Sequence, residues 1–396
     1  MPKKTESKVS PFVMAAMKTA ERVLGKEKVY VAADHEKHQT GIPIPSLALR
    51  WLIDSNVWPL QRLTQSAGVQ STFKSAFLFQ LETWFLDAGG LVAHIDTENK
   101  TSPSYMYSMI PDKYFTDDEC KMRLQFGNCA TINDWQQLIT GYVTTAREYV
   151  KDNKKRPDEP LLIAVDSMMG AGSQESKEHI EEQGDAQGRG FSDAAILISQ
   201  YLRDLSSGLI GLPITVHFTH HEKVDVQGKG FRRAGGSAPD FYASLDLRFQ
   251  KGNRTGEEYG SGDIERKNLW GRTITMTVRK SSIGPDARQI AVPIFWTYDE
   301  AQNGKQITWW DWDAAAAQLL FQKRTLLKDA FDVSSVKRDR IGDVYWSDSL
   351  SITEKDPLNG TEFGKAVINN PDVLAKIELA LKIQKHQPYG PGVLDQ

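Results

Sequence analysis

The stretch Gly68-Val69-Gln70-Ser71-Thr72-Phe73-Lys74-Ser75 decides the fold class of this 396-residue chain. It follows the pattern of a phosphate-binding loop, G-x-x-x-x-G-K-[ST], except that Phe73 replaces the second glycine. In such a loop backbone N–H groups surround the β-phosphate, the lysine reaches the β- and γ-phosphates, and the Ser/Thr hydroxyl holds Mg²⁺. Gly68, Lys74 and Ser75 keep this chemistry. The Phe73 ring could point into the protein and leave the loop intact, or it could crowd the phosphates.

Three apolar runs after this loop each lead into polar residues. The runs are 91–95, followed by Asp96-Thr97-Glu98; 161–165, followed by Asp166-Ser167; and 214–219, followed by His220-His221-Glu222. Such runs are typical of buried strands, and ligands of open α/β sheets bind at the carboxyl ends of strands. Asp166 has the position of a Walker B aspartate, which assists Mg²⁺. The sequence therefore predicts an α/β fold with a mainly parallel central sheet flanked by helices.

Three regions follow from the distribution of these patterns. Residues 1–38 include one amphipathic helix, expected over 11–25 with Gly25 as its C-cap. Residues 39–300 alternate apolar strands with helical stretches and form the core. Residues 301–396 contain a tryptophan-rich stretch and two helical runs, and we expect a separate small C-terminal domain there.

Composition limits the class of protein. The content of hydrophobic residues is 40%, which suffices for a large core, and the net charge of −3 means that any DNA site must be local. Two cysteines form no disulfide or zinc framework, no apolar run is long enough for a membrane span, and the N-terminus is not a signal peptide. We expect a cytoplasmic protein, in the host cytoplasm if it is viral.

Several segments resemble the RecA family of recombinases. The matching segments are Ile42–Leu49, similar to I-x-T-G-S-L-x-L; Arg62, where the family has G-R-I; Pro103-Ser104-Tyr105, similar to D-P-x-Y; and residues 235–244, similar to G-G-N-A-L-K-F-Y-A-S. The resemblance covers roughly residues 12 to 298, and length and segment order look most like the phage UvsX branch. It implies a RecA-like P-loop core that binds ATP and Mg²⁺ and forms a helical filament on single-stranded DNA. Such a filament pairs with homologous double-stranded DNA and exchanges strands, with a loader or single-strand-binding protein as a further partner.

The resemblance also implies roles for individual residues. Glu98 lies where the family has its catalytic glutamate, and Tyr105 where the family has the tyrosine that stacks on adenine. His220, just past its strand, would sense the γ-phosphate. Lys280 would reach into the ATP site of the adjacent subunit, but Ser282 replaces the family's second lysine there. Ser102 similarly replaces the aspartate before P-x-Y, which puts adenine recognition in doubt.

Two loops could contact DNA. Residues 170–190 are rich in Gly, Glu, Gln and Ser, and their acidity argues against phosphate contact. Residues 222–236 combine cations, an aromatic ring and glycines, a composition suited to single-stranded DNA. The residues predicted to bind DNA are Lys223, Lys229, Phe231, Arg232 and Arg233.

Alternative interpretations stay open. His217, His220, His221, Glu222 and Asp225 could hold a metal ion, although alternate strand residues point to opposite faces. Phe73 and the missing lysine could mark a hydrolysis-deficient, DNA-binding or scaffolding filament protein. The same fold could also serve a hexameric helicase or another motor.

Overall fold

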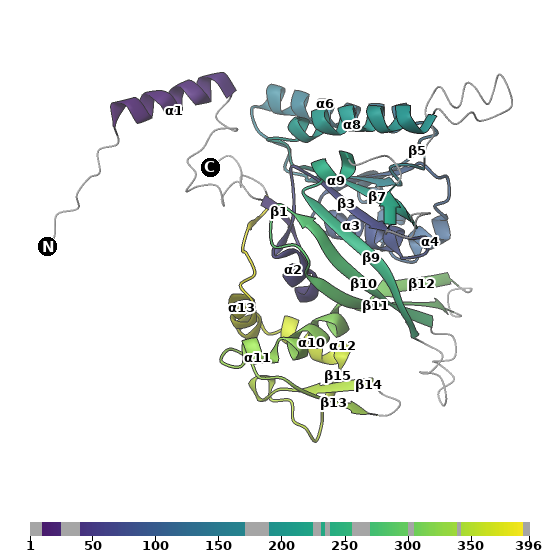
Figure 1. Ribbon diagram of the computed structural model, residues 1–396, viewed down its shortest axis with the longest axis vertical. Coiled ribbons are helices and arrows are strands. Elements are labelled where there is room, and N and C mark those ends of the chain that lie inside the picture. Colours follow the sequence, from purple (N-terminus) through teal and green to yellow (C-terminus); the bar gives the residue numbers. More distant parts are fainter. Residues whose placement is uncertain are drawn as a thin grey trace.

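The computed structural model describes residues 10–24, 40–170, 190–224, 231–233, 238–255, 270–299, 305–338 and 342–390. A ten-stranded sheet runs through it in the order β12-β11-β10-β9-β3-β7-β6-β4-β5, with β8 paired to β7 (Figure 1). The strands are β3 (Arg62–Gly68), β4 (Leu91–Asp96), β5 (Leu124–Asn128), β6 (Leu161–Asp166), β7 (Ile214–Val224), β8 (Phe231–Arg233), β9 (Leu245–Thr255), β10 (Trp270–Ser281), β11 (Gln289–Asp299) and β12 (Lys305–Trp310). Pairing is parallel from β9 through β3, β7, β6 and β4 to β5, and antiparallel from β9 to β12. The predicted mainly parallel sheet is confirmed.

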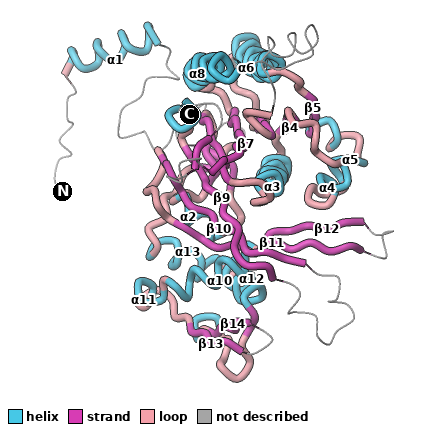
Figure 2. Tube along the Cα trace, turned by 45° about the vertical axis from the view of Figure 1, so that its right-hand side comes forward, coloured by secondary structure: helices cyan, strands magenta, loops and turns pink. Residues whose placement is uncertain are grey.

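Helices cover both faces of the parallel half, as Figure 2 shows. Alternate residues of β6 face opposite ways. Leu162 and Ala164 join the hydrophobic cluster that includes α3 (Lys74–Asp87), whereas Ile163 joins the cluster of α6 (Ile132–Asn153) and α8 (Gly190–Gly208). Burial on both faces explains why the parallel strands are apolar throughout rather than alternating. The remaining helices of this half are α4 (Pro103–Tyr107), α5 (Lys113–Thr116) and α9 (Ala238–Tyr242), with a 3₁₀ turn at Lys121–Arg123.

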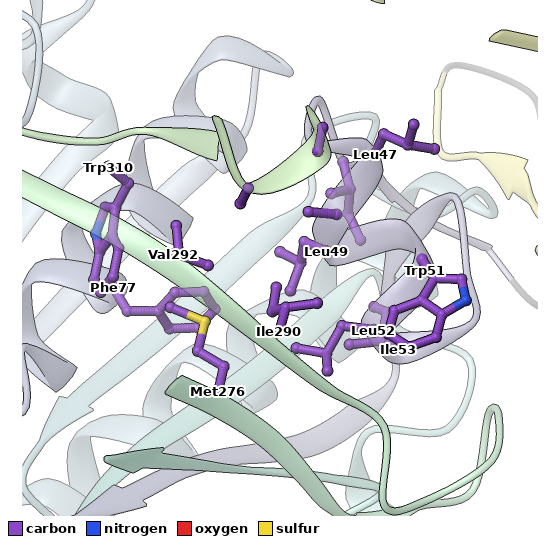
Figure 3. Packing of buried hydrophobic residues seen from close by; sticks show 14 of the residues in the cluster. Leu47, Leu49, Trp51, Leu52, Ile53, Phe77, Met276, Ile290, Val292 and Trp310 are labelled. Carbon is purple, nitrogen blue, oxygen red and sulfur yellow. The ribbon is translucent and has the colours of Figure 1, made fainter. Parts of the chain in front are cut away.

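The C-terminal region packs onto the core. Its elements are α10 (Trp312–Gln322), α11 (Arg324–Leu327), β13 (Ser334–Arg338), β14 (Gly342–Trp346), a 3₁₀ turn at Asp348–Leu350, β15 (Leu358–Asn359), α12 (Gly360–Ile368), α13 (Pro371–Ala380) and β16 (Gln387–Pro388). β13, β14 and β15 form a small sheet, while β16 pairs with β1 (Thr40–Pro43), which pairs with β2 (Val57–Pro59). One hydrophobic cluster joins α10, α12 and α13 to α2 (Leu47–Ile53) and to β10 and β11. Figure 3 shows part of it, where Leu49 and Leu52 of α2 lie beside Ile290 of β11. The region expected as a small domain therefore shares its core with the central sheet.

The predicted N-terminal helix is present as α1 (Pro11–Leu24). It lies to one side of the other elements in Figures 1 and 2, and Phe12, Val13, Met14 and Val23 are exposed on it. Among the helices that the structure describes, none is both long and apolar enough to cross a membrane.

Candidate functional site

The phosphate loop connects β3 to α3, at the carboxyl edge of the parallel strands. Phe73 is the N-cap of α3 and has a left-handed backbone, with φ of 61° and ψ of 31°. Its ring packs on Trp296 of β11, with 5.5 Å between the ring centroids. Of the two orientations expected for this ring, the structure has the one that points into the protein. Glycine is needed at Gly68, where a Cβ atom would lie 2.5 Å from the carbonyl oxygen of Phe249.

Lys74 lies folded inside this loop. Its ammonium group donates to the carbonyl oxygens of Gly68 at 3.0 Å and Val69 at 3.1 Å. Burial lowers the pKa of Lys74, although nearby Asp166 and Glu98 oppose the shift. These two bonds keep the ammonium group within the loop to which the motif assigns the phosphates.

Ser75 and Asp166 meet at the start of α3. The Ser75 hydroxyl donates to Oδ2 of Asp166 at 2.5 Å, and Thr219 of β7 donates to Oδ1 of the same carboxylate. A hydroxyl and a carboxylate are oxygen ligands of the type that Mg²⁺ takes beside nucleotide phosphates. The donor set therefore fits Mg²⁺. Within the described ranges, no group of three or more His, Cys, Asp or Glu residues could hold a metal ion, so the alternative metal cluster has no support there.

Glu98 is held by three donors. Its Oε1 accepts from the Ser167 hydroxyl at 2.6 Å and from Nε2 of His221 at 2.8 Å, and its Oε2 accepts from the Lys100 ammonium group at 2.9 Å. The hydrogen bond from His221 is the largest cause that holds the pKa of Glu98 well below its usual range. Burial opposes the shift, and the bonds from Ser167 and Lys100 add to it. Glu98 is therefore ionised, and its carboxylate is strongly stabilised in this arrangement.

Asp96 shapes the loop that carries Glu98. Its carboxylate accepts from the backbone N–H groups of Glu98, Lys100 and Thr101, at 2.8 to 3.0 Å. Asn99, between the first two, has a left-handed backbone with φ of 51°. A carboxylate engaged by backbone groups in this way positions the loop rather than the substrate, which leaves the chemistry to Glu98.

His221, rather than His220, lies beside Glu98. The expectation that His220 follows the end of its strand is wrong, because β7 continues to Val224 and includes both histidines. Adjacent strand residues point to opposite faces, so His220 is buried while His221 is partly exposed. Thr219 and His221 share one face and contact Asp166 and Glu98. Sequence reasoning did not assign Thr219, Ser167 or His221 to contacts with Asp166 and Glu98. The period of two along β7 would have grouped Thr219 with His221.

Tyr105 lies in α4 and packs against α3, the helix that follows the phosphate loop. Its ring meets Phe79 of α3 edge to face at 5.6 Å, and burial raises its pKa. α4 is joined to β12, since Ser108 accepts a backbone hydrogen bond from Thr308 at 3.0 Å, and Thr308 pairs with Trp296. Tyr105 and Trp296 therefore belong to connected elements, and Trp296 also packs on Phe73. The motifs did not indicate Trp296.

Lys280 lies against α9 within its own chain. Its ammonium group donates to the carbonyl oxygens of Asp240 at 2.8 Å and Phe241 at 2.5 Å. Four of the residues predicted to contact DNA lie on β7 and β8, where Lys223 pairs with Arg232 and Val224 with Phe231, and Glu222 pairs with Arg233. The structure does not describe Lys229 or residues 171–189. Nor does it describe the side chains of Lys223, Phe231, Arg232 and Arg233.

β7 connects the Glu98 region to this hairpin. Next to His221, the buried carboxylate of Glu222 accepts from Arg279 at 2.7 Å and from Arg248 at 3.1 Å. These contacts join β7 to β9 and β10 at this point. One continuous strand therefore runs from a partner of Glu98 to the base of a hairpin that carries cations and an aromatic residue.

The chain is similar to RecA proteins over most of its length. It is 25% identical to RecA of Lactobacillus acidophilus over 383 residues, which are 95% of this chain and 87% of the relative. It is 25% identical to RecA of Campylobacter jejuni subsp. doylei over 300 residues (74% and 77%), and 22% identical to RecA of Lactobacillus johnsonii over 377 residues (90% and 95%). No family model matches the chain. At this low identity, the similarities support membership in the RecA family as a distant relative.

Proposed function

We propose that this distant relative of RecA is a DNA-dependent ATPase that forms a filament on single-stranded DNA and promotes homologous pairing and strand exchange. The observation that carries the proposal is the contact between Glu98 and His221. It joins the carboxylate best placed for hydrolysis to the strand that enters the predicted DNA hairpin. A binding site for nucleotide alone would not need this connection.

Different side chains of the site would bind the phosphates, hold Mg²⁺ and activate the attacking water. Residues Gly68 to Ser75 would surround the phosphates, Lys74 would contact them, and Ser75 and Asp166 would hold Mg²⁺. ATP·Mg²⁺, when bound, supplies the phosphoanhydride bond that is hydrolysed. Glu98 orients the attacking water and accepts its proton.

His221 regulates the strength of this base. A carboxylate that accepts three hydrogen bonds is a weak base, because each bond stabilises its ionised form. Withdrawal of His221 from Glu98 raises the pKa of the carboxyl group and makes it a better acceptor of the water proton. DNA on the β7–β8 hairpin would shift β7 and with it His221, so that turnover responds to DNA. This role replaces the one first expected for His220.

Self-association and nucleotide choice belong to the same proposal. The exposed apolar side chains of α1 would dock on the next subunit of the filament, and Lys280 would act in the neighbouring ATP site. Tyr105, together with Trp296, would contact the base.

We place the chain on the phage UvsX branch by its length and segment order. It would act in a cytoplasm that contains the DNA and a loader or single-strand-binding protein. Residues 1–38, 39–300 and 301–396 remain our proposed divisions of the chain.

One observation favours a second candidate, a filament or scaffolding protein that binds DNA without hydrolysis. Phe73 keeps a non-glycine residue in a left-handed conformation within the phosphate loop, and Ser282 replaces a cation. Either change could reduce turnover without loss of phosphate contacts.

Measurement of ATP hydrolysis with and without single-stranded DNA separates the two candidates. We expect turnover that DNA stimulates and that both Glu98→Gln and Lys74→Ala reduce by about 100-fold or more, the scale of a lost general base or phosphate contact. Lys155→Ala, at the opposite end of β6 from Asp166, is the matched control and should retain wild-type turnover. Absence of turnover in a protein that still binds DNA would refute the ATPase and favour the scaffold.

A further inference from the structure

We propose that Lys100 is a catalytic cation of this site, which contacts the terminal phosphate of bound ATP from within the same chain. The inference rests on the proposed nucleotide site. It adds a residue that the sequence motifs do not indicate, on the loop between Glu98 and α4.

The backbone fixes Lys100 at the reacting end of the site. Its N–H group donates to Oδ2 of Asp96 at 3.0 Å, in the same set of bonds that positions Glu98 and Thr101. Its ammonium group donates to Oε2 of Glu98 at 2.9 Å. The Lys100 side chain therefore starts from a loop that Asp96 holds, and it reaches Glu98, the carboxylate to which the proposed function assigns the attacking water.

The Lys100 side chain is free to change partner. It is 77% exposed, whereas Glu98 is 15% exposed, so the ion pair lies at the surface of the site. Exposed ion pairs contribute little to stability, typically well under ~1 kcal/mol. A terminal phosphate presents several charged oxygens to the ammonium group. It is therefore a stronger partner than the single oxygen of Glu98 that the ammonium group now contacts.

The charges around the site create a need for this cation. The carboxylates of Glu98 and Asp166 lie near Lys74, the cation of the phosphate loop. Lys280, the cation expected from a neighbouring subunit, donates to two backbone carbonyl oxygens of its own chain, and Ser282 brings no charge. Phosphoryl transfer depends on neutralisation of the charge on the terminal phosphate. Lys100 would add a positive charge at the terminal phosphate to the one that Lys280 would supply from the adjacent subunit.

Nucleotide affinity tests the contact directly. We compare Lys100→Ala and Lys100→Arg with Lys155→Ala, another exposed lysine in an ion pair, which lies at the far end of β6. The probes are Mg²⁺ complexes of ADP and of an ATP analogue with an imido bridge, which cannot be hydrolysed. Lys100→Ala should weaken the analogue about tenfold, the scale of one charge-assisted hydrogen bond, and leave ADP within about twofold. Lys100→Arg should restore most of the loss, and Lys155→Ala should change neither affinity.

The outcomes separate this inference from the proposed function. An unchanged ratio of analogue to ADP affinity in Lys100→Ala, or an equal loss for both nucleotides, would overturn the role of Lys100 alone. A wild-type protein that binds the analogue but does not hydrolyse ATP would overturn the ATPase, while the ratio would still decide the contact. A wild-type protein that binds neither nucleotide would overturn both.

Discussion

Phe73 shows how one residue can depart from a motif and leave its geometry intact. A left-handed conformation costs a non-glycine residue about 1–2 kcal/mol. The ring is partly buried beside Trp296, and burial of such a ring together with an aromatic pair contributes at least a comparable amount. The structure thus offsets the backbone cost with a contact outside the motif.

Replacement of Phe73 tests this balance. Phe73→Gly should lower the free energy of unfolding by about 1 kcal/mol, because the lost burial and ring contact exceed the relieved strain. Turnover should change less than about threefold, since the ring points away from the phosphates. Denaturant unfolding beside Trp296→Ala and the double variant gives the coupling energy of the pair. A large gain in turnover with Phe73→Gly would show instead that the ring obstructs the site.

His217 makes stability depend on pH. Its ring is fully buried and forms hydrogen bonds with the hydroxyl groups of Thr64 and Ser66. Burial lowers the pKa of His217 to about 3 from an ordinary 6.5. The unfolded chain therefore takes up this proton first as the pH falls. The stability from the neutral ring is complete above pH 6.5 and is lost below it, by about 1.4 kcal/mol per pH unit. Urea unfolding from pH 7 to pH 5 should show this slope, and His217→Gln should remove it; equal slopes in the two proteins would contradict the assignment.

Residue motifs predict local geometry better than distant contacts. The positions of Lys74, Ser75 and Asp166 follow from a short loop and a strand end, so the sequence places them near one another. The sequence predicted His220 in the site, but His221 lies beside Glu98. This difference has a non-local cause, because pairing with β8 extends β7 past its expected end. Lys100 and Trp296 carried no pattern that would have singled them out.

At the scale of elements, a buried ion pair joins α3 to β4. Nδ1 of His94 lies 2.7 Å from Oε1 of Glu82, both side chains are fully buried, and the His94 ring stacks on Phe126. Within the part of the chain that the structure describes, Oε2 of Glu82 and Nε2 of His94 find no hydrogen-bond partner. Burial raises the pKa of Glu82; for His94 burial acts the other way, but the neighbouring Glu82 outweighs it and raises the pKa. The pair connects the helix of Lys74 and Ser75 to the strand that leads to Glu98.

Removal of one partner of the Glu82–His94 pair should lower the stability of the protein more than removal of both partners. His94→Phe leaves Glu82 buried without its partner and should cost about 3–5 kcal/mol of stability. Glu82→Leu combined with His94→Phe removes both charges and should recover most of that loss. Lys113→Ala, which breaks an exposed ion pair with Asp87, is the control and should cost under about 1 kcal/mol. A double variant no more stable than His94→Phe would argue against this account of the pair.

The sequence predicted the parallel half of the sheet because its strands are buried on both faces and therefore apolar throughout. The extent of β9 to β12 was harder to predict. Their antiparallel pairing brings together residues such as Trp270 and Trp296 that lie far apart in the chain. Strand lengths there depend on partners rather than on local propensity.

At the scale of the whole molecule, the C-terminal region and the sheet share one core. Arg288 and Lys323 flank the Trp51 ring, and Phe363 of α12 is fully buried against Tyr345 and Phe331. The sequence indicated the helices of this region but not its docking, because complementary surfaces leave no local pattern.

A substitution in α12 should therefore affect the entire chain. Phe363→Ala should cost about 3–5 kcal/mol and lower the midpoint of a single unfolding transition. Leu379→Ala, at an exposed position of α13, should leave the midpoint within about 1 °C. Two separate transitions, with only the first lowered, would mean that the C-terminal region unfolds independently of the sheet.

The central claim is that β7 couples DNA binding to ATP hydrolysis through His221 and Glu98. ATP hydrolysis with and without single-stranded DNA, in the wild type and in His221→Ala, tests it most directly. We predict that DNA stimulates the wild type about tenfold or more, as expected for a coupling of ~1.4 kcal/mol or more, and stimulates His221→Ala less than twofold, with DNA binding retained. Wild-type stimulation in His221→Ala, or DNA-independent hydrolysis in the wild type, would contradict the account.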